Sequence, residues 1–588
     1  MTSVNTDETD LRKPLRLWPG VAFALLLFVT LYVVPIFVPG AMLFGLIGAS
    51  VGALGILLWW LFFSRAAWME RLGALVLATV AMAVTYRFLD ESVRRGNMGF
   101  QYFVLAIPVL TLAFVAWAVA SRRFSDALRR ATMVATILLA CGAWTAVRSK
   151  GVTSAGMAQL TWRWTQTPEQ RLLAQADDEP TAIASVPAAE PQPSPPIVAE
   201  TRPQWPGLRG PERDGIVPGV RIETDWSRSP PVELWRRPIG PGVSSFAVGG
   251  DVLYTQEQRG EDEIVGAYDV TTGEPVWRHR DAARFWDPHV DAGPRATPAL
   301  AGECVYTLGA TGILNALDAD DGAVVWSLDV TSDAGAKLPT WGFVSSPLVV
   351  DDLLVVAAGS LLAYDLATGA ARWRALPGRG SYSSPHLLTI AGVPQILLIG
   401  HAAVFSVAPA DGTLLWEHPW PGFGIVQPAR IAEGDLLISM IDAAAVPVGT
   451  RRIAVAHGPA GWSVEERWTS HRLKPSFSGF VAHEGHAYGF DGSILACIDL
   501  ESGEREWKGG RYGQGQLLLL PDQDLLLVLS EQGELALVEA IPDRFTQLAR
   551  LPVLEGKTWS QPALVGDVLL VRNGLEMAGF RLAARAPV

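Results

Sequence analysis

Cysteine is scarce in this sequence of 588 residues, which contains only Cys141, Cys304 and Cys497. None of them is adjacent to another, and no Cys-x-x-Cys pair occurs. A thiolate zinc site needs closely spaced cysteines, and a disulfide framework needs a larger, even set of them. The sequence therefore predicts neither, and no metal site is expected.

Several familiar site motifs are also incomplete. Leu551 stands where a phosphate-binding loop ending in Gly556-Lys557 would need its first glycine. Ala487 breaks the histidine spacing of a zinc helix after His483, and no Gly-x-Ser-x-Gly nucleophile elbow is present. The sequence thus gives no motif for nucleotide binding, zinc-dependent hydrolysis or serine hydrolysis.

Positive charge is in short supply beyond the first third of the chain. Residues 1–172 hold 16 Lys and Arg against 8 Asp and Glu, which leaves 31 against 51 for residues 173–588. Nucleic-acid binding needs a broad positive surface, so no nucleic-acid partner is expected for this acidic portion.

Long apolar runs are confined to the first 150 residues. Ionisable side chains are nearly absent from these runs, which favours an anchor over a transporter. Each run is long enough to cross a bilayer. The sequence predicts a cytoplasmic segment over 1–17 and an all-α membrane domain over 18–150 of about five transmembrane helices: 18–39, 41–63, 69–89, 99–120 and 130–147.

Loop charges predict the orientation of these spans. With the N-terminus in the cytoplasm, the inner segments carry nine Lys and Arg and the outer segments five. The excess of positive charge belongs on the cytoplasmic side. An odd number of spans then places everything after residue 150 outside the cytoplasm.

An Ala-, Pro- and Glu-rich stretch follows. Such a composition cannot bury enough apolar surface to fold and is typical of a semi-extended spacer. We therefore interpret residues 151–204 as a flexible linker, with prolines at positions 187, 191, 193, 195, 196 and 203.

The remaining chain repeats a short phrase with fixed internal spacing. An Asp, a Gly and a Trp recur at offsets 0, +4 and +8, about every 40–50 residues, which indicates a repeat architecture. Asp and Gly suit a tight turn, and Trp supplies a large apolar surface between neighbouring repeats. The phrase occurs as Asp269, Gly273 and Trp277; as Asp318, Gly322 and Trp326; as Asp365, Gly369 and Trp373; as Asp499, Gly503 and Trp507; and, without the Asp, as Gly412 and Trp416.

Each repeat reads as four short antiparallel strands separated by turns. The last segment, 558–583, supplies three strands, and Val232–Pro238 supplies a fourth with nothing before it. Joining the two segments closes a ring and removes the free sheet edges. The predicted fold over 205–588 is an all-β eight-bladed propeller, with seven blades as the alternative because 425–470 is irregular.

The phrases Ala267–Trp277 and Ala316–Trp326 resemble the tryptophan-docking repeats of pyrroloquinoline-quinone (PQQ) type propellers. The opening Trp205-Pro-Gly-Leu-Arg-Gly-Pro211 is similar to that of bacterial PQQ-like repeat proteins. The resemblance implies the fold over about 205–583. It leaves function open, since the superfamily includes quinoprotein dehydrogenases and non-catalytic scaffolds such as BamB, the outer-membrane assembly lipoprotein.

Basic and aromatic residues recur in the connections from each fourth strand to the next first strand. These connections lie on one face, around the channel mouth, where cations and rings would attract an anionic, planar ligand. This candidate collar comprises Arg295, Lys337, Arg379, Lys474, Arg511 and Lys557, with Trp286, Trp341, Tyr382, Phe477, Tyr512 and Trp559. The alternative is that they are solvated loop residues or partners of nearby acids.

One connection is denser than the others. Asp287, His289 and Asp291 lie within five residues and could bind a cation or supply a general base. A polar loop closed by its own turn hydrogen bonds is the simpler interpretation.

Two functions are compatible with these features. The first is a bacterial inner-membrane protein whose periplasmic propeller binds a protein or a small anionic ligand, without demonstrable catalysis or cofactor. The second, implied by the resemblance, is a dehydrogenase that uses PQQ with Ca²⁺ to oxidise a sugar or alcohol and passes electrons to quinone. Adjacent cysteines, which many quinoprotein dehydrogenases place against the cofactor, are missing here.

Overall fold

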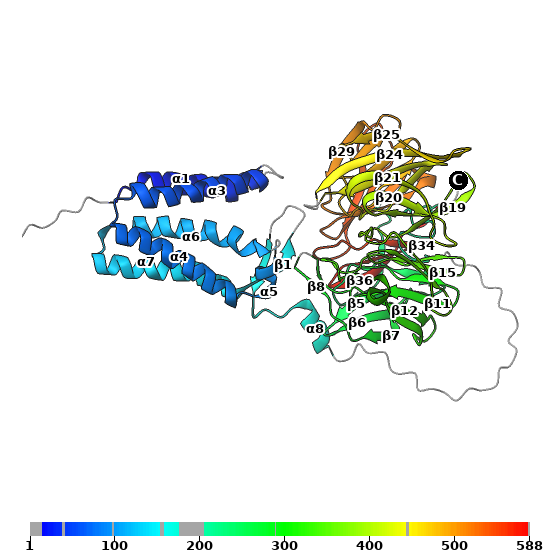
Figure 1. Ribbon diagram of the computed structural model, residues 1–588, viewed down its shortest axis with the longest axis horizontal. Helices are drawn as coiled ribbons and strands as arrows, with labels where there is room; N and C mark the ends of the chain where they lie inside the picture. Colours follow the sequence, from blue (N-terminus) through cyan, green and yellow to red (C-terminus); the bar gives the residue numbers. More distant parts are fainter. Residues whose placement is uncertain are drawn as a thin grey trace, which may run out of the picture. The chain divides into compact units, whose positions relative to one another are not determined.

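The computed structural model describes residues 15–37, 42–96, 99–152, 158–175, 205–288, 290–442 and 446–585. These residues form two compact units, Met1–Thr165 and Gln166–Val588. The first is helical and the second is built of β-sheet (Figure 1).

The helical unit follows the predicted apolar runs. Trp18–Val33 continues into a short helix at Val34–Phe37, and a small β-hairpin follows the last helix. Its elements are α1 (Trp18–Phe28), η1 (Val29–Val33), α2 (Val34–Phe37), α3 (Met42–Leu58), η2 (Trp59–Phe63), α4 (Trp68–Phe88), α5 (Glu91–Arg95), α6 (Gln101–Ala120), η4 (Ser121–Arg123), α7 (Asp126–Gly142), η5 (Ala143–Ala146), β1 (Val147–Val152) and β2 (Ala158–Trp162).

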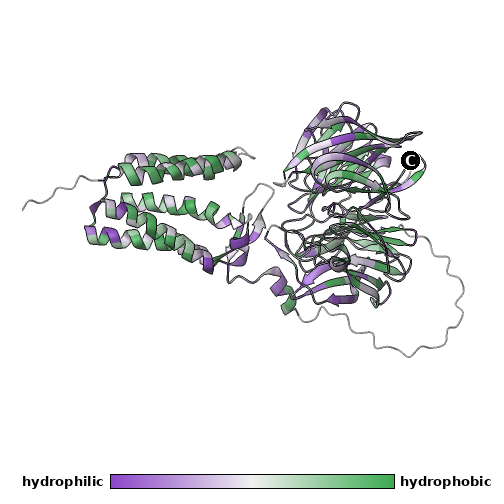
Figure 2. Ribbon diagram, in the orientation of Figure 1, coloured by the Kyte–Doolittle hydropathy of each residue, from purple (hydrophilic) through white to green (hydrophobic). Residues whose placement is uncertain are grey.

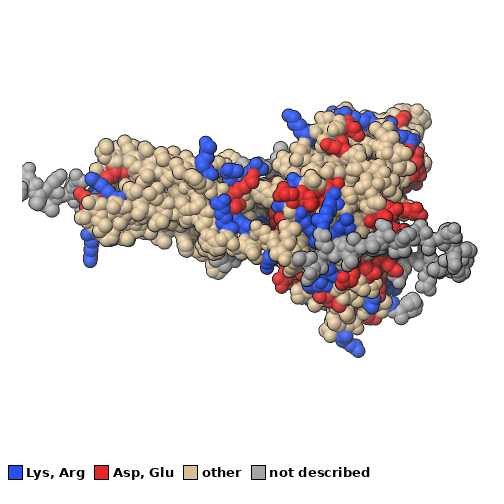
Figure 3. Space-filling model, turned by 90° about the horizontal axis from the view of Figure 1, so that it is seen from below, with Lys and Arg blue, Asp and Glu red and all other residues tan. Residues whose placement is uncertain are grey.

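Four helices of the described residues, rather than the predicted five, are long and apolar enough to cross a membrane: Phe44–Phe63, Trp68–Phe88, Gln101–Arg123 and Asp126–Ala146. The first predicted span is an apolar helix of shorter continuous length, Trp18–Val33. Figure 2 shows these helices as hydrophobic along most of their length. In Figure 3 the charged side chains of this unit gather near the ends of its helices.

A glycine stripe lets α1 and α3 approach closely. A Cβ at Gly48 would lie 2.6 Å from Thr30, one at Gly52 2.7 Å from Leu27, and one at Gly55 2.3 Å from Phe23. Small residues on one helix face are how apolar helices pack without a hydrophobic driving force between them.

Part of the predicted linker is folded. Residues 158–162 form β2, and Pro168–Ala174 form the short helix α8, so 151–204 is not a spacer throughout. The Thr167 side chain accepts a hydrogen bond from Gln170 N while the Gln170 side chain accepts one from Thr167 N. This capping box starts a helix that composition alone did not indicate. The proline-rich part, 176–204, lies outside the described residues.

The second unit consists of successive four-stranded antiparallel groups. In most groups the two middle strands are almost wholly buried and the fourth is partly exposed. The first groups are β4 (Ala247–Gly249), β5 (Val252–Arg259), β6 (Asp262–Asp269) and β7 (Pro275–Asp281); β10 (Ala299–Ala301), β11 (Cys304–Leu308), β12 (Ile313–Asp318) and β13 (Val324–Asp329); and β14 (Leu348–Val350), β15 (Leu353–Ala357), β16 (Leu361–Asp365) and β17 (Ala371–Ala375).

The later groups repeat this order. They are β18 (His386–Ile390), β19 (Val393–Ile399), β20 (His401–Val407) and β21 (Leu414–Phe423); β22 (Ala429–Ala432), β23 (Asp435–Ile441), β24 (Pro447–Gly458) and β25 (Gly461–Ser470); β26 (Val481–His483), β27 (His486–Asp491), β28 (Ile494–Asp499) and β29 (Arg505–Arg511); and β30 (Gln516–Leu520), β31 (Leu525–Leu529), β32 (Glu534–Glu539) and β33 (Gln547–Pro552).

The last sheet joins the two ends of the unit. β34 (Ala563–Val565), β35 (Val568–Arg572) and β36 (Glu576–Arg581) are completed by β3 (Val232–Pro238), which pairs with β36. The first strand of the unit is thus the fourth strand of its last sheet, the arrangement that the sequence predicts. β18–β25 form one continuous sheet, but β21 and β23 are joined only by the pair Phe423↔Ile441.

The repeated phrase couples each sheet to the next. Trp277 Nε1 donates to Ala319 O at 2.8 Å, directly after the repeated Asp318 of the following sheet. A Cβ at Gly322 would lie 2.5 Å from the Trp277 ring, so only glycine fits there, at φ 75°. The same contact recurs between Trp235 and Gly273 and between Trp326 and Gly369. The +4 and +8 spacing therefore encodes both a turn and an inter-sheet contact.

The same contact is present in two further repeats. Trp373 Nε1 donates to Pro409 O at 2.9 Å, and a Cβ at Gly412 would lie 2.7 Å from the Trp373 ring. Gly503, at φ 71°, meets the ring of Trp468 in the same way, at 2.9 Å. Trp373 and Gly503 therefore have the docking role that the spacing predicts.

Trp416 and Trp507 depart from the predicted pattern. Trp416 Nε1 donates to Gln395 Oε1 at 2.6 Å, a side chain of its own sheet, instead of a carbonyl of the next sheet. Trp507 keeps the hydrogen bond, to Ile541 O at 2.7 Å, but its ring packs on Phe545, with centroids 5.6 Å apart. The turn after β32 contains no glycine that could take the docking position, so a ring fills the space there.

Hydrogen bonds also join the segments that lie just before the first strands of neighbouring sheets. Ser245 N donates to Thr297 Oγ1 at 3.2 Å, Thr297 N to Ser346 Oγ at 2.9 Å, and Ser346 N to Ser384 Oγ at 2.9 Å. Each of the three accepting hydroxyls lies just before a first strand, and a proline follows every one of them. These side chains satisfy backbone groups that the sheet ladders leave unpaired.

Residues 205–217 form an N-terminal arm that contacts the first strands of several sheets and the residues just before them. Its two arginines are buried, and burial lowers the pKa of both Arg209 and Arg213 to about 10. Arg213 donates to Ser346 O and Pro347 O, and Arg209 donates to Phe480 O and Asp214 O. The arm also pairs with first strands at Trp205↔Val248 and through Val217 N, which donates to Leu519 O.

Candidate functional site

The mouth face carries two kinds of connection. The segments from each fourth strand to the next first strand lie there, and so do the turns between second and third strands, because antiparallel strands alternate direction. Helix α8 docks on this face. Glu169 accepts a hydrogen bond from Gly260 N at 3.0 Å and pairs with Arg284 at 2.8 Å, and Leu172 is buried.

Charged and aromatic groups from three segments meet at this face. A short hairpin has two residues in each strand, β8 (Trp286–Asp287) and β9 (Asp291–Ala292). It brings the carboxylates of Asp287 and Asp291 towards the connection after β33. His289 lies outside the described residues. We call the following set the mouth cluster: Asp287, Asp291, Arg295, Glu531, Lys557 and Trp559.

Lys557 is at the centre of the mouth cluster. Its Nζ lies 4.0 Å from the centroid of the Trp559 ring, close enough for a cation–π contact. Burial lowers the pKa of Lys557 to about 8, while Asp291, Glu531 and Asp287 act in the opposite direction. Trp559 Nε1 in turn donates to Glu531 Oε1 at 3.2 Å. An amine with a perturbed pKa among carboxylates and a ring is a feature of binding and catalytic sites.

Backbone carbonyl groups of nearby residues hold the Arg295 side chain in place. Its guanidinium is buried and donates to Gly293 O and, at 2.8 Å, to Asp291 O. It also lies 4.7 Å from the centroid of the Phe285 ring. Burial lowers its pKa to about 10 although Asp287, Glu263 and Asp291 are nearby.

Half-buried rings extend the mouth on the other side. Trp341 and Tyr382 have centroids 4.7 Å apart, and Phe423 lies 5.9 Å from Tyr382. Burial raises the pKa of Tyr382, and so does the nearby Asp287, which ties this group to the hairpin. The ring centroid of Phe477 lies 4.7 Å from that of Trp559, which belongs to the mouth cluster.

The other predicted collar residues do not join the mouth cluster. Lys337, Arg379 and Arg511 are exposed on their own connections, and Arg379 lies over the Phe405 ring. Lys474 pairs with Asp491 at 3.4 Å, a carboxylate that also binds Arg505 and Lys508.

Two aromatic residues of the predicted collar also differ in their surroundings. Tyr512 is 0% exposed, and its hydroxyl donates a hydrogen bond to Gln547 Oε1 at 2.8 Å. Its ring is therefore not open to a ligand, and the prediction that it stacks on one is wrong. Trp286 begins the hairpin and is half-buried.

Sequence reasoning missed Glu531 and Glu263, since it considered only connections between sheets. Both residues flank turns between second and third strands, which share the mouth face. Glu263 is 3% exposed and accepts a hydrogen bond from Ala310 N at 3.2 Å. Burial raises its pKa to about 7, opposed by the Ala310 hydrogen bond and assisted by Asp281.

The raised pKa of Glu263 predicts a pH dependence of stability. Between pH 4.5 and about 7 the folded protein holds a proton on Glu263 that the unfolded chain has released. Stability contributed by this group is thus complete below pH 4.5 and is lost as the pH rises through 7. We expect Glu263→Gln to flatten that part of the profile and to be more stable than the natural sequence at pH 8, measured by thermal unfolding of the full chain in detergent.

The matched control is Glu303→Gln, an exposed glutamate in the turn between β10 and β11. It should leave the slope between pH 4.5 and 7 unchanged. An unchanged slope for Glu263→Gln as well would contradict the buried, protonated state proposed for this carboxyl.

Comparisons with known proteins find similar chains for the β-sheet unit. A family model described as outer membrane protein assembly factor BamB matches residues 261–541. BamB of Shewanella oneidensis is 28% identical over 380 residues, which cover 58% of this chain and 87% of that protein. The C-terminal unit is a β-propeller that is similar to the PQQ-like propellers of this family.

Two solved structures are similar to this propeller. BamB from Moraxella catarrhalis matches with a TM-score of 0.44 and 13% identity, over 60% of this chain and all of that one, 100%. Quinohemoprotein alcohol dehydrogenase from Comamonas testosteroni matches with a TM-score of 0.47 and 14% identity, over 66% of this chain and 81% of that one.

The mouth cluster does not fit PQQ itself. A flat tricarboxylate needs several cations with donors to spare. Both terminal nitrogens of Arg295 are bonded to backbone carbonyls, and Lys474 is bonded to Asp491. Lys557 is surrounded by the carboxylates of Asp287, Asp291 and Glu531, which would repel an added carboxylate.

Proposed function

We propose that this protein is a scaffold of the bacterial envelope whose PQQ-like propeller binds a protein partner at its mouth face. The observation that carries this proposal is the mouth cluster with its neighbouring rings. Charges there are already paired, and Trp341, Tyr382, Phe423 and Trp559 are half-buried. Tryptophan, tyrosine and arginine are enriched at the centres of protein–protein interfaces, where a polar rim surrounds them.

The similarity to BamB supports the choice of a protein as partner. The Shewanella oneidensis relative is named an outer membrane protein assembly factor, and the similarity spans most of that protein. On this proposal Lys337, Arg379 and Arg511 form the exposed rim of the same face.

The helical unit would hold the propeller at the inner membrane. Apolar side chains such as Val51, Val80 and Leu139 are 51%, 52% and 72% exposed, which suits lipid surroundings better than water. With the short helix Trp18–Val33 counted as a fifth span, the N-terminus lies in the cytoplasm and the propeller in the periplasm.

We further propose that the propeller has eight blades. The single pair Phe423↔Ile441 is a weak link within the continuous sheet of β18–β25. Separating that sheet there leaves two groups of four consecutive strands, β18–β21 and β22–β25, like the other groups.

Photo-crosslinking from the mouth tests the proposed function. Benzoylphenylalanine in place of Tyr382, in the full chain in native membranes, should form an adduct with a discrete protein. The same residue in place of Val324, which is 50% exposed on β13, is the matched control and should form none.

A charge change checks that the mouth cluster supports the contact. Lys557→Glu would place a fourth carboxylate beside Asp287, Asp291 and Glu531, and we expect at least a tenfold loss of the Tyr382 adduct. Lys337→Glu, on the rim, should have a much smaller effect. Equal labelling from positions 382 and 324, or no protein adduct from position 382, would overturn the proposal.

A further inference from the structure

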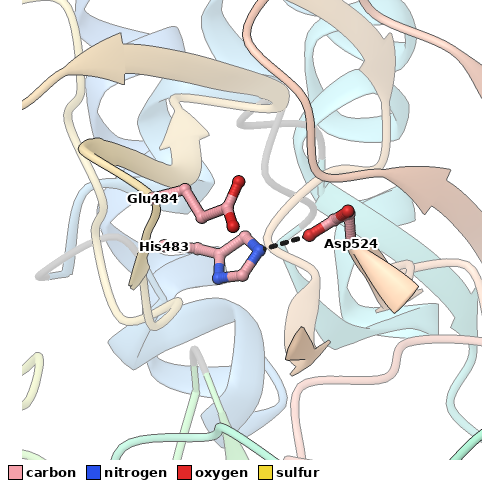
Figure 4. Close-up of side chains that lie close together, drawn as sticks. All are labelled: His483, Glu484 and Asp524. Atoms are coloured by element: carbon pink, nitrogen blue, oxygen red, sulfur yellow. Dashed lines mark hydrogen bonds and ion pairs between the residues drawn. The ribbon is translucent and has the colours of Figure 1, made fainter. Parts of the chain in front are cut away.

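Three potential metal ligands converge on the face opposite the mouth. His483 ends β26, Glu484 follows it, and Asp524 ends the turn between β30 and β31 (Figure 4). His483 Nε2 lies 2.7 Å from Asp524 Oδ1. The ligand atoms of all three residues lie within 4.8 Å of one another.

We propose that His483, Glu484 and Asp524 bind a divalent transition-metal ion such as Zn²⁺. One imidazole nitrogen and two carboxylates are a ligand set that zinc accepts, with bond lengths of roughly 2.0–2.2 Å. These bonds separate neighbouring ligand atoms by roughly 3.3 Å in a tetrahedron. Glu484 is exposed and the Asp524 side chain is 48% exposed, so both carboxylates have room to rotate towards that spacing, whereas the His483 side chain is only 11% exposed.

The turn that carries Asp524 is braced from both sides. The backbone carbonyl of Asp524 accepts a hydrogen bond from Ala540 N at 2.7 Å. Gln523 exchanges two hydrogen bonds with the backbone of Ile222, at 2.6 and 3.0 Å. Outer contacts of this kind hold a metal ligand in position before the ion arrives.

A cavity that is partly open to solvent adjoins Asp524. It has a volume of about 420 Å³ and is lined by Asp524 together with Arg221, Arg585 and Glu539. Three protein ligands leave a tetrahedral ion with one open position, which catalytic zinc sites fill with water or substrate. The cavity would admit a small anionic ligand to the neighbourhood of that position, with the two arginines as its counter-charges.

A neighbouring group is a weaker candidate. His486, Asp499 and Glu506 also lie within 4.8 Å of one another. Asp499 Oδ1 already accepts hydrogen bonds from Ser502 N at 2.7 Å and Ser502 Oγ at 2.6 Å, as part of the repeated turn. This carboxylate is therefore committed to the fold.

Titration of the metal-free full chain in detergent with Zn²⁺ tests the proposal. A chromophoric chelator reports the affinity, and Co²⁺ in place of Zn²⁺ reports coordination by its visible absorption. We expect one stoichiometric site. His483→Ala and Asp524→Asn should each weaken binding by more than the roughly 10- to 100-fold that loss of an outer partner costs.

His486→Ala and His457→Ala are the matched controls. His457 lies on β24, against Trp462, so the variant His457→Ala should leave the affinity for Zn²⁺ unchanged. The variant His486→Ala should leave it unchanged as well. Absence of stoichiometric binding by the natural sequence would overturn the proposal, and so would loss of binding in His486→Ala with retention in His483→Ala. The metal-dependent rise in unfolding temperature should disappear in the Asp524→Asn variant, whose fold can be checked without metal.

Discussion

Replacing Gly322 by alanine is expected to destabilise the propeller by roughly 2–6 kcal/mol. A non-glycine residue in a left-handed conformation costs about 1–3 kcal/mol, and φ at Gly322 is 75°. The added Cβ would also lie 2.5 Å from the Trp277 ring of the preceding sheet. Overpacking of that kind costs about 1–3 kcal/mol more. Denaturant unfolding of the full chain, followed by tryptophan fluorescence, gives the loss directly.

Gly302→Ala separates the two causes. Gly302 is a turn glycine of the same sheet, with φ 58°, but nothing lies within 4 Å of the position its Cβ would take. It should therefore show only the conformational part of the loss. Equal destabilisation by the two variants would contradict the claim that the repeated glycine is a docking position for tryptophan.

Removing the Arg572 guanidinium should cost roughly 3–5 kcal/mol, because it joins the last sheet to the first. Arg572 is 0% exposed and donates to Thr255 Oγ1 at 2.5 Å, to Gln256 O at 2.7 Å and to Gly240 O at 3.4 Å. Removing one member of a buried charged network costs about 3–5 kcal/mol, because its partners are left unpaired in the interior. We expect Arg572→Met to lower the midpoint of propeller unfolding accordingly.

Arg581→Met is the matched control for ring closure. Arg581 belongs to the same sheet, on β36, but its side chain is 51% exposed and pairs with an exposed Asp567 at 3.4 Å. An exposed pair contributes about 0–1 kcal/mol. A loss of similar size in both variants would mean that the closing sheet does not depend on the buried guanidinium.

Much of the fold could be predicted because one spacing serves two purposes. Asp318 closes a turn, Gly322 makes room for Trp277, and Trp326 repeats the contact on the next sheet. The pairing of β3 with β36 followed from counting strands at the two ends of the repeat region. Helix α8 escaped prediction because its signal is a seven-residue segment beside a proline-rich composition.

The spacing alone could not show where the docking contact changes. Trp416 and Trp507 stand at the predicted offset, yet each takes a different partner, Gln395 and Phe545 respectively. Those partners depend on what the neighbouring strand or the next turn presents, and neither lies within the repeated phrase itself.

The candidate site was only partly visible in the sequence. Arg295, Lys557 and Trp559 were identified because they lie in connections between sheets. Glu531 and Glu263 were missed because they flank turns within a sheet. The sequence predicted no metal site, since His483 and Asp524 come from turns 41 positions apart and meet only through the packing of neighbouring sheets.

The arm shows a further limit of sequence reasoning. Residues 205–211 resemble a family signature, but residues 205–217 contain no strand pattern that would place them. Their arginines bind carbonyl groups of distant sheets, including Phe480 O and Pro347 O. Contacts of this range depend on the finished fold rather than on local preference.

Titration of the full chain with PQQ and Ca²⁺ tests most directly the claim that the mouth is a protein-binding surface rather than a cofactor site. The paired charges of Arg295, Lys474 and Lys557 predict no cofactor absorbance on the repurified protein and no dye-linked oxidation of sugars or alcohols. Stoichiometric PQQ absorbance with turnover would contradict the account, most of all if Lys557→Glu abolished both while the protein remained folded.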